Sequence, residues 1–491
     1  MTALNAEKKE GTSFFQEIKL RLFFLFTTNK GLIALLILFE FGIVLFLSSF
    51  SEPVVEVFGN PILDPIWKID LNESDRAARI IMLYHAMAIP FIATVVLFVL
   101  EFCEVRETYV SKIKWALIPG TFLTAINGLI FAYILEDWTA HGLFIFGLSL
   151  SFYSGVLLLL GTFPTKNFPE SADKEDKPLF WGIDLEQLNL MLVTAFLLTS
   201  TIIGGWAAAY FGRSPGLEAF LAEDVVREES ANIYERAIVS HLHIMVALLA
   251  AAVMIVIFQY TEMKGRWYFI AMLLTTPGML IMSIGAWLVI PEQTHDYAHW
   301  IINVGVGFLL AAALILALNG WNKTSRENLG EDYDAASWTQ RAIAALKDPV
   351  KFGMYFQFVW VNLVVTIPGV YVALNLDTYR GDGYEKVERA FNTGHWHVLA
   401  TLTAIVVLFL AIDYFGIKGN FRQSVGWLLL AGSIISFGFT VFCMLRDPAM
   451  DKMLSFYLID AGVALIFAGV AIFCLALLLK FIWERPVDRS T

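Results

Sequence analysis

The sequence predicts an all-α polytopic membrane protein, with twelve transmembrane helices in three pseudo-symmetric four-helix arcs. Three observations support this fold class. The 491 residues are 58% hydrophobic and 16% charged, whereas soluble domains carry about 25% charged residues. Many apolar runs reach the roughly 20 residues that a helix needs to cross a bilayer. Similar segments also recur three times along the chain.

The composition excludes several classes of protein. So much apolar surface argues against a cytosolic enzyme, a secreted disulfide scaffold and a nucleic-acid-binding module. The net charge of −11 gives no support to a polyanionic partner. The three cysteines form no CxxC pair, so the chain lacks a thiol-redox motif and a covalent c-type haem site. Residues 1–20 do not resemble a signal peptide, because they lack a short apolar core.

The twelve predicted spans are continuous apolar runs, which indicates helices rather than the alternating strands of about 10 residues found in membrane barrels. They lie near 31–50, 78–102, 113–134, 141–162, 186–210, 237–260, 267–290, 298–319, 352–375, 392–414, 424–444 and 456–482. We expect one membrane domain at 31–483, with an N-terminal segment at 1–30 and a tail at 484–491.

The basic residues predict the orientation of these spans. An even number of spans places both termini on the same side. The tails and loops of that side hold 23 of the 34 lysines and arginines. The positive-inside rule therefore predicts a multi-pass protein of the cell membrane with both termini in the cytoplasm. The long polar segments 163–183 and 320–348 are then cytoplasmic loops.

An internal repeat divides the spans into three groups of four. Segments 75–90, 235–250 and 388–403 each combine an acidic residue, arginine and alanine with a histidine in the following apolar helix. The histidines that align are His85, His243 and His397, which are 158 and 154 residues apart. A basic residue follows each by 21 positions, at Arg106, Lys264 and Lys418. A second match follows by 56 positions, at His141, His299 and Met453.

This periodicity predicts repeat units at about 31–162, 186–319 and 352–482. Symmetry of packing alone is the other explanation for it. All eight histidines fall at or near the predicted outer ends of spans, at positions 85, 141, 241, 243, 295, 299, 395 and 397. Histidine within a membrane helix is costly, so it indicates a functional site by default.

Two HxH pairs restrict the chemistry further. Positions i and i+2 of an α-helix point about 200° apart, so His395 and His397 cannot chelate one metal from one helix face. They can serve two centres on opposite sides of the helix. Imidazole is the usual axial ligand of haem iron, and the surrounding aliphatic residues suit a porphyrin. An interhelical hydrogen bond remains the alternative for any single histidine.

The pattern resembles the catalytic subunit of the haem–copper oxidase superfamily, which includes the nitric oxide reductases. That family has twelve core helices in three arcs, a histidine in the second helix and an HxH in the tenth. Here Tyr84-His85 matches the second helix, and Gly394-His395-Trp396-His397 matches the tenth. The resemblance implies that His85 and His397 are axial ligands of a low-spin haem. It also implies that His395 is the proximal ligand of a high-spin haem, and both haems are expected to be of b type.

The resemblance also implies a non-haem metal beside the high-spin haem. The sixth helix of the family supplies a histidine to this metal, and His241 is preferred to His243 because it is in register with His395. His243 would instead be a haem ligand if the chain were only an electron carrier. Arg446 occupies the loop where the family has arginines that pair with haem propionates.

The departures from the family pattern concern the metal site. The family has adjacent histidines at the end of the seventh helix, whereas this chain has His295 and His299. Their i,i+4 spacing would let both face one metal, although His299 also matches His141 in the repeat. Glu292 would complete a histidine–carboxylate set for non-haem iron, with an interfacial acid as the equal alternative. The cross-linked tyrosine and the channel lysine of the oxidases are missing.

These departures favour a relative of the nitric oxide reductases over a proton-pumping oxidase. The leading hypothesis is a haem-dependent oxidoreductase that reduces nitric oxide or oxygen, using two haems and iron or copper. A cytochrome c-type protein or another outer donor subunit would supply electrons, within a respiratory complex in the lipid bilayer. The alternative is a non-catalytic multi-haem electron-transfer subunit. A transporter is disfavoured, because the histidines cluster near one side and the repeats are parallel.

Overall fold

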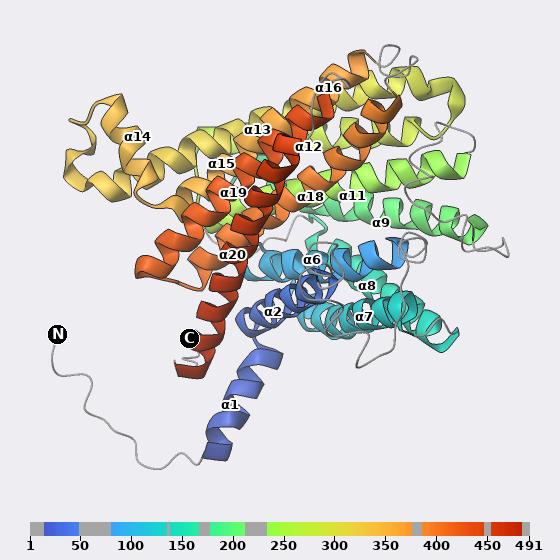
Figure 1. Cartoon of the computed structure of the whole chain (residues 1–491), viewed down its shortest axis with the longest axis horizontal. Helices are drawn as coiled ribbons and strands as arrows, with labels where there is room; N and C mark the ends of the chain where they lie inside the picture. The colour runs from blue at the N-terminus through green and yellow to red at the C-terminus, as the bar shows by residue number, and fades with distance from the viewer. Residues whose placement is uncertain are drawn as a thin grey trace.

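The computed structural model describes residues 14–48, 80–134, 138–165, 177–211, 233–375, 385–445 and 453–483. Over these residues the protein is an all-α polytopic membrane protein (Figure 1). Twelve of the described helices are long and apolar enough to cross a bilayer. The predicted fold class and the predicted number of spans are therefore confirmed.

The spanning helices form three units of four in chain order. Unit 1 contains α2 (Asn29–Ser48), α6 (Ile80–Phe102), α7 (Glu107–Tyr133) and α8 (Trp138–Thr162). Unit 2 contains α9 (Leu185–Phe211), α11 (Ile233–Tyr260), α12 (Arg266–Leu288) and α13 (His295–Leu329). Unit 3 begins with α15 (Pro349–Val361), a π-helical turn η5 (Asn362–Thr366) and α16 (Ile367–Leu374), which together make one span. It continues with α18 (Glu385–Tyr414), α19 (Gly419–Leu445) and α20 (Met453–Trp483).

The packing of these helices repeats from unit to unit. In each unit the first helix packs against the second, and the third packs against the fourth. The fourth helix of each unit also packs against the first helix of the next: α8 against α9, α13 against α15, and α20 against α2. This last contact closes the ring, so the three predicted units are three arcs around a common centre.

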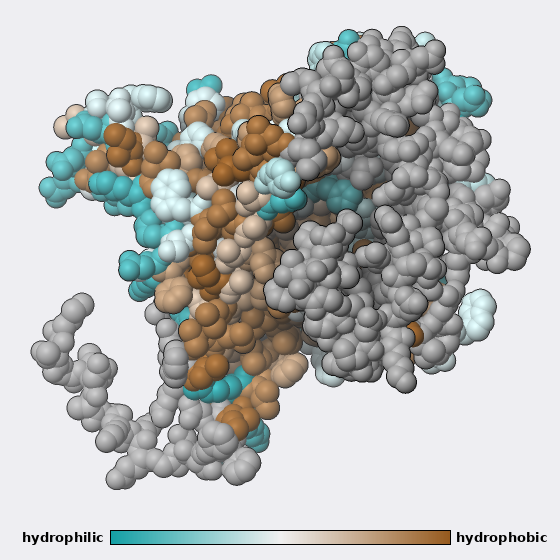
Figure 2. All heavy atoms as spheres, viewed as in Figure 1, coloured by the Kyte–Doolittle hydropathy of each residue, from teal (hydrophilic) through white to brown (hydrophobic). Residues whose placement is uncertain are grey.

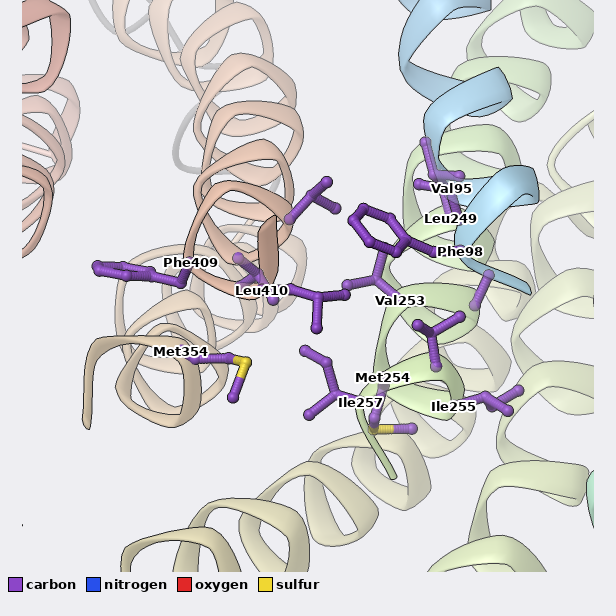
Figure 3. Packing of buried hydrophobic residues seen from close by; sticks show 14 of the residues in the cluster. Val95, Phe98, Leu249, Val253, Met254, Ile255, Ile257, Met354, Phe409 and Leu410 are labelled. Atoms are coloured by element: carbon purple, nitrogen blue, oxygen red, sulfur yellow. The ribbon is translucent and has the colours of Figure 1, made fainter. Parts of the chain in front are cut away.

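The second helices of the three units form that centre. Helices α6, α11 and α18 meet through a single apolar cluster (Figure 3). Phe98 of α6, Val253 of α11 and Leu410 of α18 are each at most 1% exposed. Lipid replaces water around the bundle, so close packing rather than the hydrophobic effect holds these helices together.

A pair of glycines sets the crossing of the third and fourth helices in every unit. The pairs are Gly120 with Gly147, Gly278 with Gly305, and Gly432 with Gly462. A Cβ atom added to the first glycine of each pair would lie 2.7–3.1 Å from the carbonyl oxygen of the second. Only glycine permits this approach of two backbones, as in other membrane helix pairs. Gly120, Gly278 and Gly432 are spaced by 158 and 154 residues, like the aligned histidines.

Polar contacts repeat at the end of the bundle that lies opposite the histidines. Sixteen positions after each aligned histidine stands a polar residue: Glu101, Gln259 and Asp413. Each of them reaches the start of the first helix in its own unit. Asn29 donates to Glu101 at 2.9 Å, and Gln259 donates to Glu186 at 2.6 Å. Arg422 joins Asp413 to Asp348, the N-cap of α15, with contacts of 2.7 Å to each.

The π-helical turn η5 interrupts the first span of unit 3. The Asn362 side chain donates to the Phe358 carbonyl oxygen at 2.5 Å, and Thr366 donates to the Asn362 side chain at 2.9 Å. Pro368 follows two residues later and has no N–H to donate to the preceding turn. The wide turn therefore lies where the backbone hydrogen-bond ladder would be broken in any case.

The remaining described elements lie outside the spans, in segments that the sequence analysis treated as terminal segments or loops. They are α1 (Phe14–Thr27), the hairpin β1 (Leu179–Phe180) and β2 (Ile183–Asp184), the turns η3 (Glu292–Thr294) and η4 (Gly330–Tyr333), and α14 (Trp338–Leu346). A capping box of Ser337 and Gln340 starts α14. Hydrophilic side chains gather around α14, while apolar ones cover the middle of the bundle (Figure 2). We call this the α14 end and the opposite one the histidine end.

Candidate histidine site

The described histidines lie near the histidine end because each stands in the N-terminal half of an even-numbered span, and these spans all run in the same direction. His85 and His141 are in unit 1, His241, His243 and His299 are in unit 2, and His395 and His397 are in unit 3. Neither the side chain of His295 nor any part of Arg446 belongs to the described residues. Glu292 lies in the turn η3, where its side chain is exposed.

Between units 2 and 3, His243 is fixed at both ring nitrogens. Its Nδ1–H donates to the carbonyl oxygen of Val239 at 2.9 Å, one turn earlier in α11. Its Nε2 accepts a hydrogen bond of 3.0 Å from the indole nitrogen of Trp396 in α18. A carbonyl can only accept, so these partners define the tautomer. His243 also lies within electrostatic range of both His299 and His395.

The ring of His395 packs against a glycine of the neighbouring helix. A Cβ atom added to Gly369 of α16 would lie 2.8 Å from Cε1 of His395. The glycine therefore lets the ring pack against the α16 backbone. Because Gly369 follows η5, the wide turn helps to set which face of α16 meets the ring.

Between units 1 and 2, His241 lies in an equivalent position. Its Nδ1–H donates to the Ser200 carbonyl oxygen at 2.8 Å, with the Ser200 hydroxyl 3.1 Å from the same nitrogen. A Cβ atom added to Gly204 would lie 2.9 Å from that nitrogen. Among the described residues, Nε2 of His241 has no hydrogen-bond partner. A histidine that donates Nδ1–H to a carbonyl oxygen presents Nε2 as a ligand, as is usual at metal centres.

His85 and His141 stand near His241 on the unit 1 side. His85 is within electrostatic range of His241 and meets the Phe144 ring edge-on at 6.1 Å. His141 stacks on the same Phe144 ring, with ring centroids 6.4 Å apart. The repeat relates His85, His141 and His241 to His243, His299 and His395. Two symmetry-related histidine clusters thus lie at two successive unit interfaces.

The third interface, between units 3 and 1, carries His397. The Tyr84 hydroxyl lies 3.0 Å from Nε2 of His397, joining α6 to α18. The position equivalent to His241 and His395 is here Leu83, which packs against the buried Ala132 of α7. An apolar contact therefore replaces the histidine and glycine contact in this unit.

The preference for His241 as the metal-site partner of His395 stays a prediction. Among the described rings, His395 lies within electrostatic range of His243, and His241 lies within electrostatic range of His85. Nothing described brings the exposed Glu292 to these rings. Within the described part of the chain, no three histidine, cysteine, aspartate or glutamate side chains converge closely enough to hold a metal ion.

Sequence reasoning missed the residues that orient the histidines. These are Ser200, Gly204, Gly369, Trp396 in its hydrogen-bonding role, and Tyr84. Trp396 lies inside the GHWH motif, so its position was visible, but its partner was not. The glycines and the serine lie on other helices, and only the rotation of each helix about its axis reveals them.

The residues fit a porphyrin better than a chelated metal ion. His241 and His395 each pack against a glycine, and apolar residues line the helices around them. One histidine on a helix suffices as an axial haem ligand, whereas a chelated metal ion needs three or four convergent side chains. No family model matches this chain, and no curated protein matches its sequence.

Proposed function

We propose that the protein is a haem-dependent membrane oxidoreductase that reduces a diatomic molecule, nitric oxide or oxygen. One observation carries the proposal: two clusters of histidines, related by the internal repeat, lie at one end of the three central helices. Packing alone does not require imidazoles at both places, since Leu83 fills the third equivalent position. Haem, when bound, would supply the electron storage and the affinity for a diatomic ligand.

Individual side chains have distinct roles in this proposal. His85 and His397 would hold a low-spin haem, and His395 would hold a second haem. Ser200 fixes the tautomer of His241 through its carbonyl oxygen, and Trp396 fixes the orientation of His243. These second contacts keep each ring in one rotamer, which a ligand of precise geometry needs.

The cellular setting is part of the same proposal. The excess of basic residues supports a cytoplasmic α14 end and an outer histidine end. A cytochrome c-type protein or another outer donor subunit then delivers electrons near the haem sites. The chain lacks a CxxC attachment motif, so both haems would be held without covalent bonds, and b type is the form that we propose.

A second function has a specific observation in its favour. No metal-binding group of three is present among the described residues, and because both ring nitrogens of His243 have protein partners, the haem ligands of this function would be His85, His395 and His397. This suits a multi-haem electron-transfer subunit without a non-haem metal. The two functions differ in coordination, because an electron carrier has only six-coordinate irons, whereas an enzyme keeps one open position.

The test is the spectrum and metal content of the purified protein. Reduced protein should contain two haems, one of which shifts its absorption on adding carbon monoxide, and iron or copper beyond the haems would identify a non-haem metal site as well. Low-spin haems whose absorption does not change on adding carbon monoxide would exclude the reductase and support the electron-transfer function. Protein that binds no haem would overturn both. A variant at Trp338, which is 82% exposed and far from the site, is the control, and its haem content and spectrum should equal those of the unaltered protein.

A further inference from the structure

A row of polar side chains crosses the interior of unit 2. It begins at Glu186 in the first turn of α9, at the α14 end, where the residue is 7% exposed. Its Oε2 accepts hydrogen bonds from Gln259 of α11 at 2.6 Å and from the Tyr268 hydroxyl of α12 at 3.0 Å. Gln259 and Tyr268 are also hydrogen-bonded to each other. Side chains from α9, α11 and α12 thus meet at one carboxylate.

Other ionisable groups surround this carboxylate. Lys177 lies 3.4 Å from Asp184 and 2.9 Å from Glu104, and it is within electrostatic range of Glu186, so one ammonium group stands among three carboxylates. Gln187 is fully buried beside them, with its amide nitrogen bound to the Glu104 carbonyl oxygen at 2.8 Å. Its Oε1 finds no hydrogen-bond partner among the described residues. The surplus of negative charge makes this cluster attractive to protons.

The next polar contact lies one turn deeper. Thr276 of α12 donates to Oδ1 of Asn189 at 2.7 Å, and the Asn189 amide donates to the Met272 carbonyl oxygen at 3.0 Å. Asn189 is completely buried. It stands three residues beyond Glu186, which is about 4.5 Å along the helix axis. Hydrogen bonds between neighbouring helices explain this contact without any further function.

The same explanation does not cover the deeper part of the row. Ser283 and Trp287 lie on the face of α12 that carries Tyr268 and Thr276, at helical spacing. Among the described residues, neither the Ser283 hydroxyl nor the Trp287 indole nitrogen has a hydrogen-bond partner, and both atoms are buried. Unsatisfied polar groups are expensive in a membrane interior, and water is their usual partner.

The row ends at the histidines. The Trp287 ring packs against Phe196 of α9, with centroids 5.5 Å apart. Ser200 follows Phe196 by one turn on the same helix and contacts His241. Ser240, next to His241 in α11, has a further buried hydroxyl without a partner in the described chain. Polar atoms therefore extend from one end of unit 2 to the other.

We propose that this row conducts protons, with Glu186 as the group that takes them up from the α14 side. The inference rests on the proposed function, because reduction of oxygen or nitric oxide consumes protons near the histidines. Between Thr276 and Ser283 the helix rises about 10 Å, and the proposed path needs water molecules over that distance. Glu186 accepts a proton from the aqueous phase and passes it inward past Asn189.

The experiment uses the full chain in vesicles with a known orientation. Turnover is started with excess electron donor, and pH-sensitive dyes inside and outside report which side loses protons. Glu186→Gln keeps the hydrogen-bond acceptor but cannot carry a proton, and Glu186→Asp restores the carboxylate. Ser283→Ala tests the row independently of Glu186. The controls are Glu107→Gln, an exposed acid starting α7, and Thr275→Val, whose hydroxyl only bonds the Ala271 carbonyl oxygen.

We expect Glu186→Gln and Ser283→Ala to slow proton uptake from the α14 side at least tenfold, with electron delivery to the haems unchanged. Glu186→Asp should recover part of the rate, and both controls should match the parent protein. If the parent protein turns over and both variants take up protons at the same rate as the parent, the proposed path is wrong and the proposed function still stands. The same conclusion follows if the parent protein takes up protons only from the histidine side. A parent protein without turnover overturns the proposed function, and the path with it.

Discussion

The indole nitrogen of Trp396 donates a hydrogen bond to Nε2 of His243 at 3.0 Å, and the two rings meet at 90°. This contact joins the central helices of units 2 and 3 at the depth of the histidine clusters. It also explains why a tryptophan, rather than a smaller apolar residue, separates the two histidines of the GHWH motif. The ring fills the interface, and its N–H fixes the tautomer that the Val239 carbonyl oxygen selects.

Replacing Trp396 by phenylalanine should weaken the interface between α11 and α18. The aromatic packing is largely retained, but Nε2 of His243 loses its donor. Hydrogen bonds between membrane helices contribute about 0.6 kcal/mol on average and up to about 1.7 kcal/mol. We expect a loss of about 1 kcal/mol in thermal or denaturant unfolding. Trp338→Phe at the exposed α14 position should change nothing measurable, and equal losses in both variants would contradict the role of the hydrogen bond.

Adding a methyl group at Gly204 should displace His241. The new Cβ would lie 2.9 Å from Nδ1 of the ring, which is shorter than any relaxed contact of this kind. We expect a loss of about 1–3 kcal/mol in stability, and altered absorption of any haem bound nearby. Gly205→Ala is the matched control, because its Cβ would meet nothing within 4 Å. Spectra and melting curves of the two variants would refute the prediction if they coincided.

Removing Arg422 should destabilise the α14 end. Its guanidinium binds Asp348 through two nitrogens and also contacts Asp413, and all three side chains are at most 21% exposed. Arg422→Ala leaves two carboxylates facing each other without a cation, so we expect a loss of about 2–4 kcal/mol. Arg422→Lys should lose less, because the charge stays while the forked geometry is lost.

The Lys351 and Glu327 pair provides a comparison for Arg422. Its atoms are equally close, at 2.6 Å, but both side chains are more exposed. Exposed ion pairs contribute about 0.2–1 kcal/mol, so Lys351→Ala should cost far less than Arg422→Ala. Chemical unfolding of the two alanine variants measures this difference. Similar losses of stability in the two variants would mean that the buried network of Arg422 contributes no more than an exposed ion pair.

Cys103 should resist alkylation in the folded protein. Burial raises the pKa of the Cys103 thiol well above its usual range, and the nearby Glu186 and Glu104 carboxylates raise it further. The thiolate is the reactive form, so its fraction is very small at neutral pH. The neutral thiol stabilises the fold below the usual thiol pKa, and this stability is lost as the pH rises above it. Mass spectrometry after maleimide treatment should find Cys103 labelled only in denatured protein; ready labelling at pH 7 would contradict this.

The number of spans was predictable because a membrane helix must be long and apolar throughout. No tertiary contact is needed to recognise α2 or α13 as a span, since each is apolar over a length that can cross the hydrocarbon core. The three units were predictable for a related reason. Equivalent positions in a repeat keep the same residue type, as at His85 and His243.

The grouping of the histidines was not predictable from the same repeat. His241 and His395 are equivalent positions, and this equivalence suggested that they share one site. Around a rotational axis, however, equivalent residues occupy equivalent but different interfaces. His241 therefore lies between units 1 and 2, and His395 lies between units 2 and 3. The neighbours of each ring depend on the rotation of α11 about its own axis. Apolar residues lie on all sides of this helix, so the sequence does not determine that rotation.

The glycine pairs could have been found in the sequence. Gly120, Gly278 and Gly432 have the same spacing as the aligned histidines, and a search for all repeated positions would have detected them. Their role was less accessible, because a glycine in a membrane helix can serve a turn, a kink or a close crossing. Only the partner glycine on the neighbouring helix identifies the crossing.

The π-helical turn Asn362–Thr366 makes the first span of unit 3 one residue longer than an uninterrupted α-helix over the same height. Deleting a single residue from this turn would therefore leave a regular α-helix of the same height, and the residues beyond it would keep their faces. Gly369 would still lie against His395. The wide turn thus lets this span differ by one amino acid, the smallest change of length that a gene can encode, without moving the glycine away from the histidine.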